Sequence, residues 1–139
     1  MSEATANQAA KAATFKALHD APDVFVIPNP WDPGSTRMLE ACGFKALATT
    51  SAGYAFSIGV GDGAITLEQK LAHCEEVCAA TTLPVSADME NCFNDAPAGV
   101  AETVRRAAAT GLVGCSVEDF AREGPPKIYD FDHSVERVA

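Results

Sequence analysis

The feature that most constrains this chain is a repeated alternation of short apolar runs and Ala-rich helical stretches. The runs are apolar without interruption, and they cover residues 24–27, 46–49, 84–87 and 113–117. Strands that are apolar on both faces and joined by helices are typical of a parallel sheet covered on both sides. The pattern predicts an α/β fold of four parallel βα units, and both a doubly wound sheet and a (β/α)₈ barrel fit it.

Helix signals follow the apolar runs. Thr66 has the position of an N-cap, and Gly43 and Gly111 have the positions of C-cap glycines. The segment 51–63 contains four glycines and is expected to be a loop. Helices are expected over residues 35–42, from Thr66 to about residue 80, from Pro97 to Gly111, and from residue 132 to the end of the sequence.

Polar residues gather at one end of the predicted strands. The turns that enter the strands carry no acidic group, whereas the positions at or after the strand ends hold Asn29, Thr50, Ser51, Asp62, Asp88, Glu90, Glu118 and Asp119. Such a one-sided distribution is expected where βα loops build a site. The sequence also stops within a predicted helix, at about half the length of a typical barrel. We therefore expect a truncated first half of a (β/α)₈ TIM-type barrel over residues 15–139, preceded by a flexible or helical extension over residues 1–14.

The acidic residues suggest a cation site. Asp88 and Glu90 point to the same side of an extended segment, Glu118 holds the equivalent place on the next strand, and Asp62 lies in a preceding loop. Carboxylates that converge repel one another unless a cation or shared protons compensate. Oxygen ligands without nearby His or Cys favour Mg²⁺. The alternative is structural: Asp88 caps the following loop, and Glu118 pairs with an exposed arginine.

Hydroxyl and backbone N–H groups follow the second predicted strand, at Thr50, Ser51 and Ala52. They could surround a carboxylate or a developing oxyanion, although a plain turn has the same composition. Trp31 could wall the pocket or pack beneath the first βα loop. Tyr54 could donate to a substrate oxygen or pack within its loop. His19, His73 and His133 are expected in core or surface roles.

Four ordered segments resemble the isocitrate lyase/phosphoenolpyruvate mutase family, and the match runs from about Phe15 to Asp119. They are Pro28-Asn29-Pro30-Trp31-Asp32-Pro33-Gly34-Ser35, Ala48-Thr49-Thr50-Ser51-Ala52-Gly53-Tyr54-Ala55, Pro84-Val85-Ser86-Ala87-Asp88-Met89-Glu90 and Val117-Glu118-Asp119. The resemblance implies a barrel enzyme that makes or breaks a C–C or P–C bond beside an α-keto acid or its enolate.

The resemblance also implies roles for single residues. Asp88 would bind Mg²⁺ or Mn²⁺ directly, and the metal-bound waters would be held by Asp62, Glu90 and Glu118. The carboxylate and keto oxygen of a small α-keto acid or phosphonate substrate would be surrounded by Thr50, Ser51 and Ala52. Tyr54 and Trp31 are further candidates for substrate binding.

The chain departs from the family pattern in three places. Many members carry glycines where this chain has Asn91-Cys92-Phe93-Asn94. The Lys-Lys-Cys-Gly-His loop of the family's lyases is absent from the sequence, so Cys92 and Cys115 are not assigned as catalytic acids. The Lys/Asn-bearing loop of the mutases is not evident over residues 120–127.

Composition excludes several function classes. The formal charge of −9 with no Lys/Arg cluster argues against nucleic-acid binding. No apolar run approaches the roughly 18 residues of a membrane span, and no export signal is evident. Five cysteines without paired spacing indicate free thiols in a reducing compartment, so a cytoplasmic protein is expected.

Open sheet edges predict a homo-oligomer, with contacts shared by the valines of the runs: Val24, Val26, Val85, Val113 and Val117. Two other interpretations stay open. One is a flavodoxin-like binding or signalling module, although such a module needs an acidic pair where this chain has Pro28-Asn29-Pro30. The other is a non-catalytic truncated half-barrel.

Overall fold

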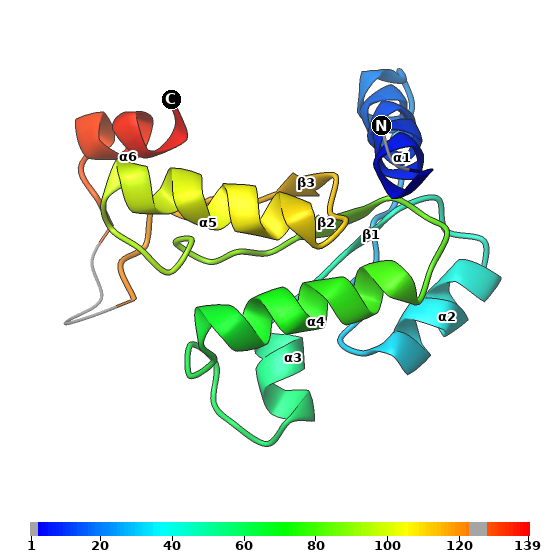
Figure 1. The fold of residues 1–139 in the computed structure, drawn as a ribbon, viewed down its shortest axis with the longest axis horizontal. Helices are drawn as coiled ribbons and strands as arrows, with labels where there is room; N and C mark the ends of the chain where they lie inside the picture. The colour runs from blue at the N-terminus through cyan, green and yellow to red at the C-terminus, as the bar shows by residue number, and fades with distance from the viewer. Residues whose placement is uncertain (1–2, 123–127) are drawn as a thin grey trace.

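The computed structural model describes residues 3–122 and 128–139, and its centre is a three-stranded parallel sheet. The strands are β1 (Leu47–Ala48), β2 (Val85–Ala87) and β3 (Gly114–Cys115), and they lie in the order β1-β2-β3. The helices are α1 (Glu3–Asp20), α2 (Pro33–Ala41), α3 (Ser51–Ser57), α4 (Leu67–Ala79), α5 (Pro97–Ala109) and α6 (Phe131–Val138). In Figure 1, α4 and α5 lie beside each other, with α6 at one end of α5 and α1 near the other.

Three of the four predicted strands are confirmed, and the first is wrong. Residues 24–27 form no strand of the described sheet, and Val24 is fully exposed. The segment reaches the sheet edge only near Pro28, whose carbonyl accepts from the Ala48 N–H (3.1 Å), while the Asn29 side chain donates to the Ala48 carbonyl (2.9 Å). Pro28 and Pro30 have no N–H to donate, so this segment cannot build a regular ladder.

The predicted loop 51–63 is also partly wrong, because it begins with helix α3. The Thr50 hydroxyl caps α3 by accepting from the Gly53 N–H (3.2 Å), and buried Ala55 anchors the helix to the core. Gly53 belongs inside this helix: a Cβ there would lie 2.6 Å from the Thr50 methyl group. Gly59 follows the C-cap of the helix and has a positive φ, and Gly63, also with a positive φ, lies further along the loop.

Local capping explains where the other helices begin. Asp32 caps α2, and Thr66 caps α4 through a reciprocal capping box with Gln69. Pro97 lies in the first turn of α5, where its missing N–H costs nothing. The core packs α4 and α5 against the sheet through residues that include Leu47, Leu71, Cys74, Val77, Val85, Val100 and Ala107.

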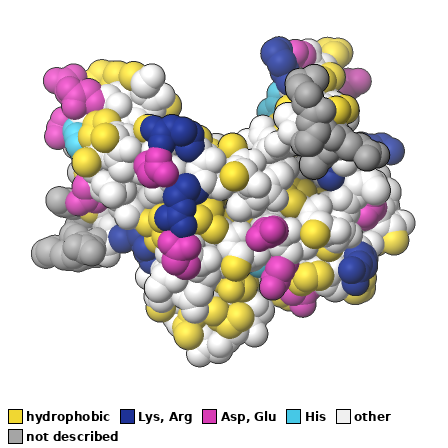
Figure 2. Space-filling model, in the orientation of Figure 1, with side chains coloured by type: hydrophobic (Ala, Val, Ile, Leu, Met, Phe, Trp, Pro, Cys, Tyr) yellow, Lys and Arg dark blue, Asp and Glu magenta, His cyan; other side chains and the backbone are white. Residues whose placement is uncertain are grey.

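On the face shown in Figure 2, basic and acidic side chains are neighbours where α4 and α5 meet. An exposed ion pair between Arg106 and Glu68 (2.7 Å) joins the two helices there. The five cysteines are free, as the sequence indicates, with Cys74 and Cys92 buried and Cys42 exposed. Among the described helices, none combines the length and apolarity needed to cross a membrane.

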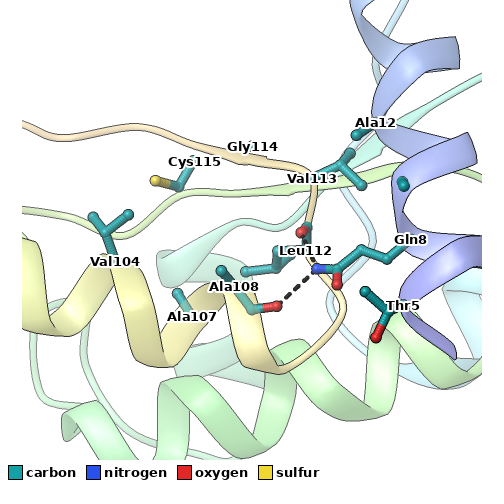
Figure 3. A pocket seen from close by; sticks show the side chains of 11 residues that line it. Thr5, Gln8, Ala12, Val104, Ala107, Ala108, Leu112, Val113, Gly114 and Cys115 are labelled. Carbon is teal, nitrogen blue, oxygen red and sulfur yellow. Dashed lines mark hydrogen bonds between the residues drawn. The ribbon is translucent and has the colours of Figure 1, made fainter. Parts of the chain in front are cut away.

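Helix α1 covers the end of the sheet where the strands begin, and it runs without a break through residues 14 and 15. The Gln8 amide donates to the Ala108 and Leu112 carbonyls (2.8 Å each), and Phe15 packs so closely on Gly114 that a Cβ there would lie 3.1 Å from its ring. An apolar cavity of about 400 Å³ lies between α1, α5 and β3 (Figure 3). It is not the predicted acidic site, because none of its lining residues is acidic.

Candidate functional site

Asp88 follows β2 directly and is held by the start of α3. Its Oδ2 accepts from the backbone N–H of Ser51 (2.9 Å) and from the Ser51 hydroxyl (2.6 Å), and its Oδ1 accepts from the Glu90 N–H (3.1 Å). Burial by itself raises the pKa of Asp88, but these hydrogen bonds, together with the charge of Lys70, bring that pKa below its usual value. Asp88 is therefore a preorganised carboxylate, and it also caps the following turn.

Thr49 lies beneath Asp88 and connects it to helix α4. Its hydroxyl accepts from the Asp88 N–H (3.3 Å) and from the ammonium of Lys70 (3.0 Å). Lys70 is completely buried. The sequence did carry a signal for this: Lys70 shares the buried face of α4 with His73, Cys74 and Val77, at helical spacing.

Glu90 is paired with Arg122, from the segment after β3. Glu90 Oε2 lies 2.8 Å from Arg122 Nε, and the guanidinium stacks on the Phe93 ring (4.2 Å to its centroid). Arg122 also donates to the carbonyls of Gly63 (2.6 Å) and Ile65 (2.8 Å). The expected arginine partner of the acidic cluster thus exists, but its side-chain partner is Glu90 rather than Glu118.

The turn from Glu90 to Phe93 is strained. Glu90, Cys92 and Phe93 all have positive φ values of 51° to 59°, a region that favours glycine. The buried guanidinium of Arg137, from α6, donates to the carbonyls of Asn91 (2.6 Å) and Asn94 (3.1 Å), which flank Cys92 and Phe93. It also donates to the Glu118 carbonyl (2.7 Å), and so ties two strand-end loops together.

A polar cavity of about 370 Å³ opens at this end of the sheet. Three carboxylates border it, and the residues that line it are Ser51, Asp62, Gly63, Glu90, Glu118, Phe120, Ala121 and Arg122. Burial raises the pKa of Glu118, and the negative charges of Asp88, Asp62 and Asp119 raise it further. Burial also raises the pKa of Glu90, although Arg122 opposes that shift. The cavity is therefore a place where added positive charge is favourable.

The structure brings together some of the predicted site residues and separates others. Ser51, Asp62, Glu90 and Glu118 border one cavity, and Asp88 joins them through Ser51. Thr50 is occupied as the cap of α3, with Ala52 behind it in the first turn. Tyr54 stacks on His73 (ring centroids 4.0 Å apart), and half-exposed Trp31 contributes its carbonyl to His73 Nε2 (3.0 Å). Neither Tyr54 nor Trp31 lines the acidic cavity.

Sequence reasoning missed three cations at this site: Lys70, Arg122 and Arg137. Lys70 alone had a pattern that could have shown it. The contacts of Arg122 and Arg137 join segments far apart in the chain, and no local pattern shows them. Residues 120–127, in which the Lys/Asn-bearing loop of the mutases is not evident from sequence, lie mostly outside the described residues, because 123–127 are not among them.

The donor set fits a divalent cation that keeps most of its water. Within residues 3–122 and 128–139, no three His, Cys, Asp or Glu side chains converge closely enough to enclose an ion. Mg²⁺ does not need such a cage, since it usually binds one or two carboxylates and retains several waters. Glu90 Oε1 is buried without a hydrogen-bond partner in the described structure, which leaves one oxygen able to accept from a metal-bound water.

Similarity to known proteins extends over most of the chain. Residues 15–139 match the family model described as phosphoenolpyruvate phosphomutase. A crystal structure described as a lyase/mutase from Burkholderia cenocepacia J2315 superposes with a TM-score of 0.91 at 55% identity, covering 95% of this chain and 48% of that one. A 2,3-dimethylmalate lyase structure superposes with a TM-score of 0.81 at 29% identity, covering 92% and 46% of the two chains.

A curated relative, the 2-methylisocitrate lyase of Bacillus subtilis (strain 168), is 28% identical over 109 residues, which are 78% of this chain and 36% of that protein. This chain therefore spans about half the length of the solved structures it matches, and less of this curated relative.

Proposed function

The chain belongs to the phosphoenolpyruvate phosphomutase family, and we propose that it forms the metal-binding half of an enzyme that makes or breaks a C–C or P–C bond beside an α-keto acid or its enolate. The observation that carries this proposal is the cavity at the carboxyl end of the strands. It is bordered by three carboxylates and lies beside Asp88, which Ser51 fixes in place.

The sheet order supports a half-barrel of the (β/α)₈ type. The strands follow one another in space as they do in the chain, β1-β2-β3. In a flavodoxin-like sheet the first strand instead lies between the second and the third, and the ligand binds where the strand order reverses. The sequential order therefore favours a barrel segment over a doubly wound binding module.

The acidic residues would hold Mg²⁺ or Mn²⁺, with Asp88 as the direct ligand and Asp62, Glu90 and Glu118 holding its waters. The bound ion would supply a Lewis acid that stabilises negative charge on an enolate oxygen. Ser51 contributes by keeping the Asp88 carboxylate charged and oriented, because its two donors favour the ionised form.

Arg122 is the cation that borders the cavity itself. Its guanidinium can bind a carboxylate or phosphonate group of the substrate in exchange for part of its contact with Glu90. Either group offers two or more oxygens that accept hydrogen bonds from the guanidinium. Thr50, Ser51 and Ala52 remain our candidates for surrounding the substrate. The N–H and hydroxyl of Ser51 are already donated to Asp88, so Ser51 would act on substrate through that carboxylate.

The first test is divalent-cation binding by isothermal titration to the 139-residue chain. We expect Mn²⁺ to bind, and we expect Asp88→Ala to lose most of the affinity. Asp23→Ala is the matched control, because it removes an exposed carboxylate that does not line the cavity. Equal affinities of Asp88→Ala and the unsubstituted chain would remove Asp88 from the site.

The second test concerns chemistry. Exchange of the methyl protons of pyruvate in D₂O, followed by NMR, reports enolate formation directly. Exchange that depends on Mg²⁺ and stops with EDTA would support the proposed reaction class. Metal binding without exchange for any of a panel of α-keto acids would support a non-catalytic half-barrel instead.

A further inference from the structure

Lys70 is a buried charged side chain to which the proposed reaction gives no role. It is fully buried, and it is the largest such side chain in the described structure. Among the described residues its ammonium has a single hydrogen-bond acceptor, the Thr49 hydroxyl. A buried ammonium with one neutral partner is costly, so a chain that keeps it without a compensating role is unusual.

The ammonium of Lys70 lies close to the acidic residues and away from solvent. The hydroxyl that accepts from Lys70 Nζ (3.0 Å) also accepts from the Asp88 N–H (3.3 Å), so one hydroxyl separates the ammonium from the backbone of Asp88. Burial lowers the pKa of Lys70, and the negative charges of Asp88 and Glu90 oppose that shift. Lys70 is thus one hydroxyl group away from the backbone of Asp88, and it is electrostatically coupled to Asp88 and Glu90.

A fixed positive charge at this position has two consequences. It stabilises Asp88 and Glu90 in their ionised forms when the cavity holds no other cation. It also repels a divalent cation that those carboxylates attract, because the repulsion acts through partly desolvated protein rather than bulk water.

We propose that the buried ammonium of Lys70 is an internal counter-ion of Asp88 and Glu90 that limits the affinity of the cavity for a divalent cation. This inference rests on the proposed function, since it assumes that the cavity binds such a cation. It assigns to Lys70 a role in setting metal affinity and not in contacting substrate.

The test compares Mn²⁺ affinity, measured by the electron paramagnetic resonance of free Mn²⁺, across four chains. They are the unsubstituted chain, Lys70→Met, Lys70→Arg and Lys45→Met. Methionine fills a similar volume without charge, so Lys70→Met is expected to fold, and urea unfolding verifies this. Lys45→Met removes the same charge from an exposed lysine in the turn before β1, at the opposite end of the sheet.

We expect Lys70→Met to bind Mn²⁺ at least about tenfold more tightly. Removing one positive charge about 6 Å from a divalent ion gives about tenfold even at the dielectric constant of bulk water, and the lower effective dielectric constant of protein increases the effect. Lys70→Arg, which restores the charge, should return the affinity toward that of the unsubstituted chain. Lys45→Met should leave it unchanged.

The outcomes separate the two proposals. If the unsubstituted chain binds Mn²⁺ and Lys70→Met binds it equally or more weakly, the role of Lys70 is refuted and the metal site stands. If neither chain binds Mn²⁺, the metal site and the counter-ion role are both refuted. If only Lys70→Met binds, the counter-ion role is supported in its strongest form.

Discussion

His73 should make the folded chain sensitive to mild acid. The side chain is 1% exposed, its Nε2 lies 3.0 Å from the Trp31 carbonyl, and its ring stacks on Tyr54. The carbonyl can only accept, so Nε2 carries the proton of the neutral ring. The other nitrogen, Nδ1, is buried and has no hydrogen-bond partner in the described structure. Protonation would therefore place an unpaired charge inside the protein.

The expected magnitude follows from the pKa of His73. Burial, and secondarily the charge of Lys70, lowers that pKa from 6.5 to about 4, despite the opposing hydrogen bond to Trp31. The unfolded chain keeps a pKa near 6.5 and therefore binds the proton first as the pH falls. The free energy of unfolding contributed by this difference is fully present above pH 6.5 and is lost progressively toward pH 4. By pH 4.5 the loss is about 2.5 kcal/mol.

Urea unfolding at pH 7.5, 5.5 and 4.5 tests this prediction. His73→Gln retains a side-chain N–H for the Trp31 carbonyl but cannot titrate. We expect its stability to fall less between pH 7.5 and pH 4.5 than that of the unsubstituted chain, by about 2.5 kcal/mol. His19→Gln, on the surface of α1, is the control and should keep the unsubstituted slope. Parallel slopes for His73→Gln and the unsubstituted chain would refute the argument.

Three further predictions concern the strained turn and the sheet edges. Cys92→Gly should be more stable in urea than Cys92→Ala by about 1 kcal/mol, because only alanine retains the penalty of a left-handed φ; the reverse order would contradict the strain. Arg137→Met leaves three backbone carbonyls without their donor and should lose about 2–4 kcal/mol of unfolding free energy, whereas an unchanged melting temperature would show that water replaces it. The chain should self-associate in light scattering, and Val24→Asp with Val26→Asp should reduce association; a monomer before substitution would oppose the open-edge argument.

The sequence predicted the strands correctly where the apolar run is buried in the sheet. It failed for residues 24–27, where backbone hydrogen bonding determines whether a strand forms. Val85 and Leu47 are buried on a sheet that helices cover, and their runs read correctly from hydrophobicity alone. Residues 24–27 are equally apolar, yet they lie beside the sheet without joining it. Hydrophobicity does not report whether a neighbouring chain segment supplies hydrogen-bond partners, and the prolines at 28 and 30 were the relevant signal.

The prediction of a loop directly after β1 was wrong for a different reason. The four glycines of residues 51–63 suggested an irregular loop. Gly53, however, lies within a helix, where the close approach of Thr50 leaves no room for a Cβ atom. Composition cannot distinguish a glycine needed for space from one needed for a positive φ. The N-cap residue Thr50 was visible in the sequence, and it was the better indicator of a helix.

The strained turn lies where the sequence has Asn91-Cys92-Phe93-Asn94 instead of glycines, and tertiary contacts stabilise it. Glycine adopts a left-handed backbone conformation at little cost, whereas Cys92 and Phe93 adopt it here against a steric penalty. The structure retains the conformation and adds restraints from outside the turn. Arg137 binds the flanking carbonyls, while Arg122 stacks on Phe93 and pairs with Glu90. Because both arginines come from later segments, the orientation of Glu90 toward the cavity depends on contacts that form only in the folded chain.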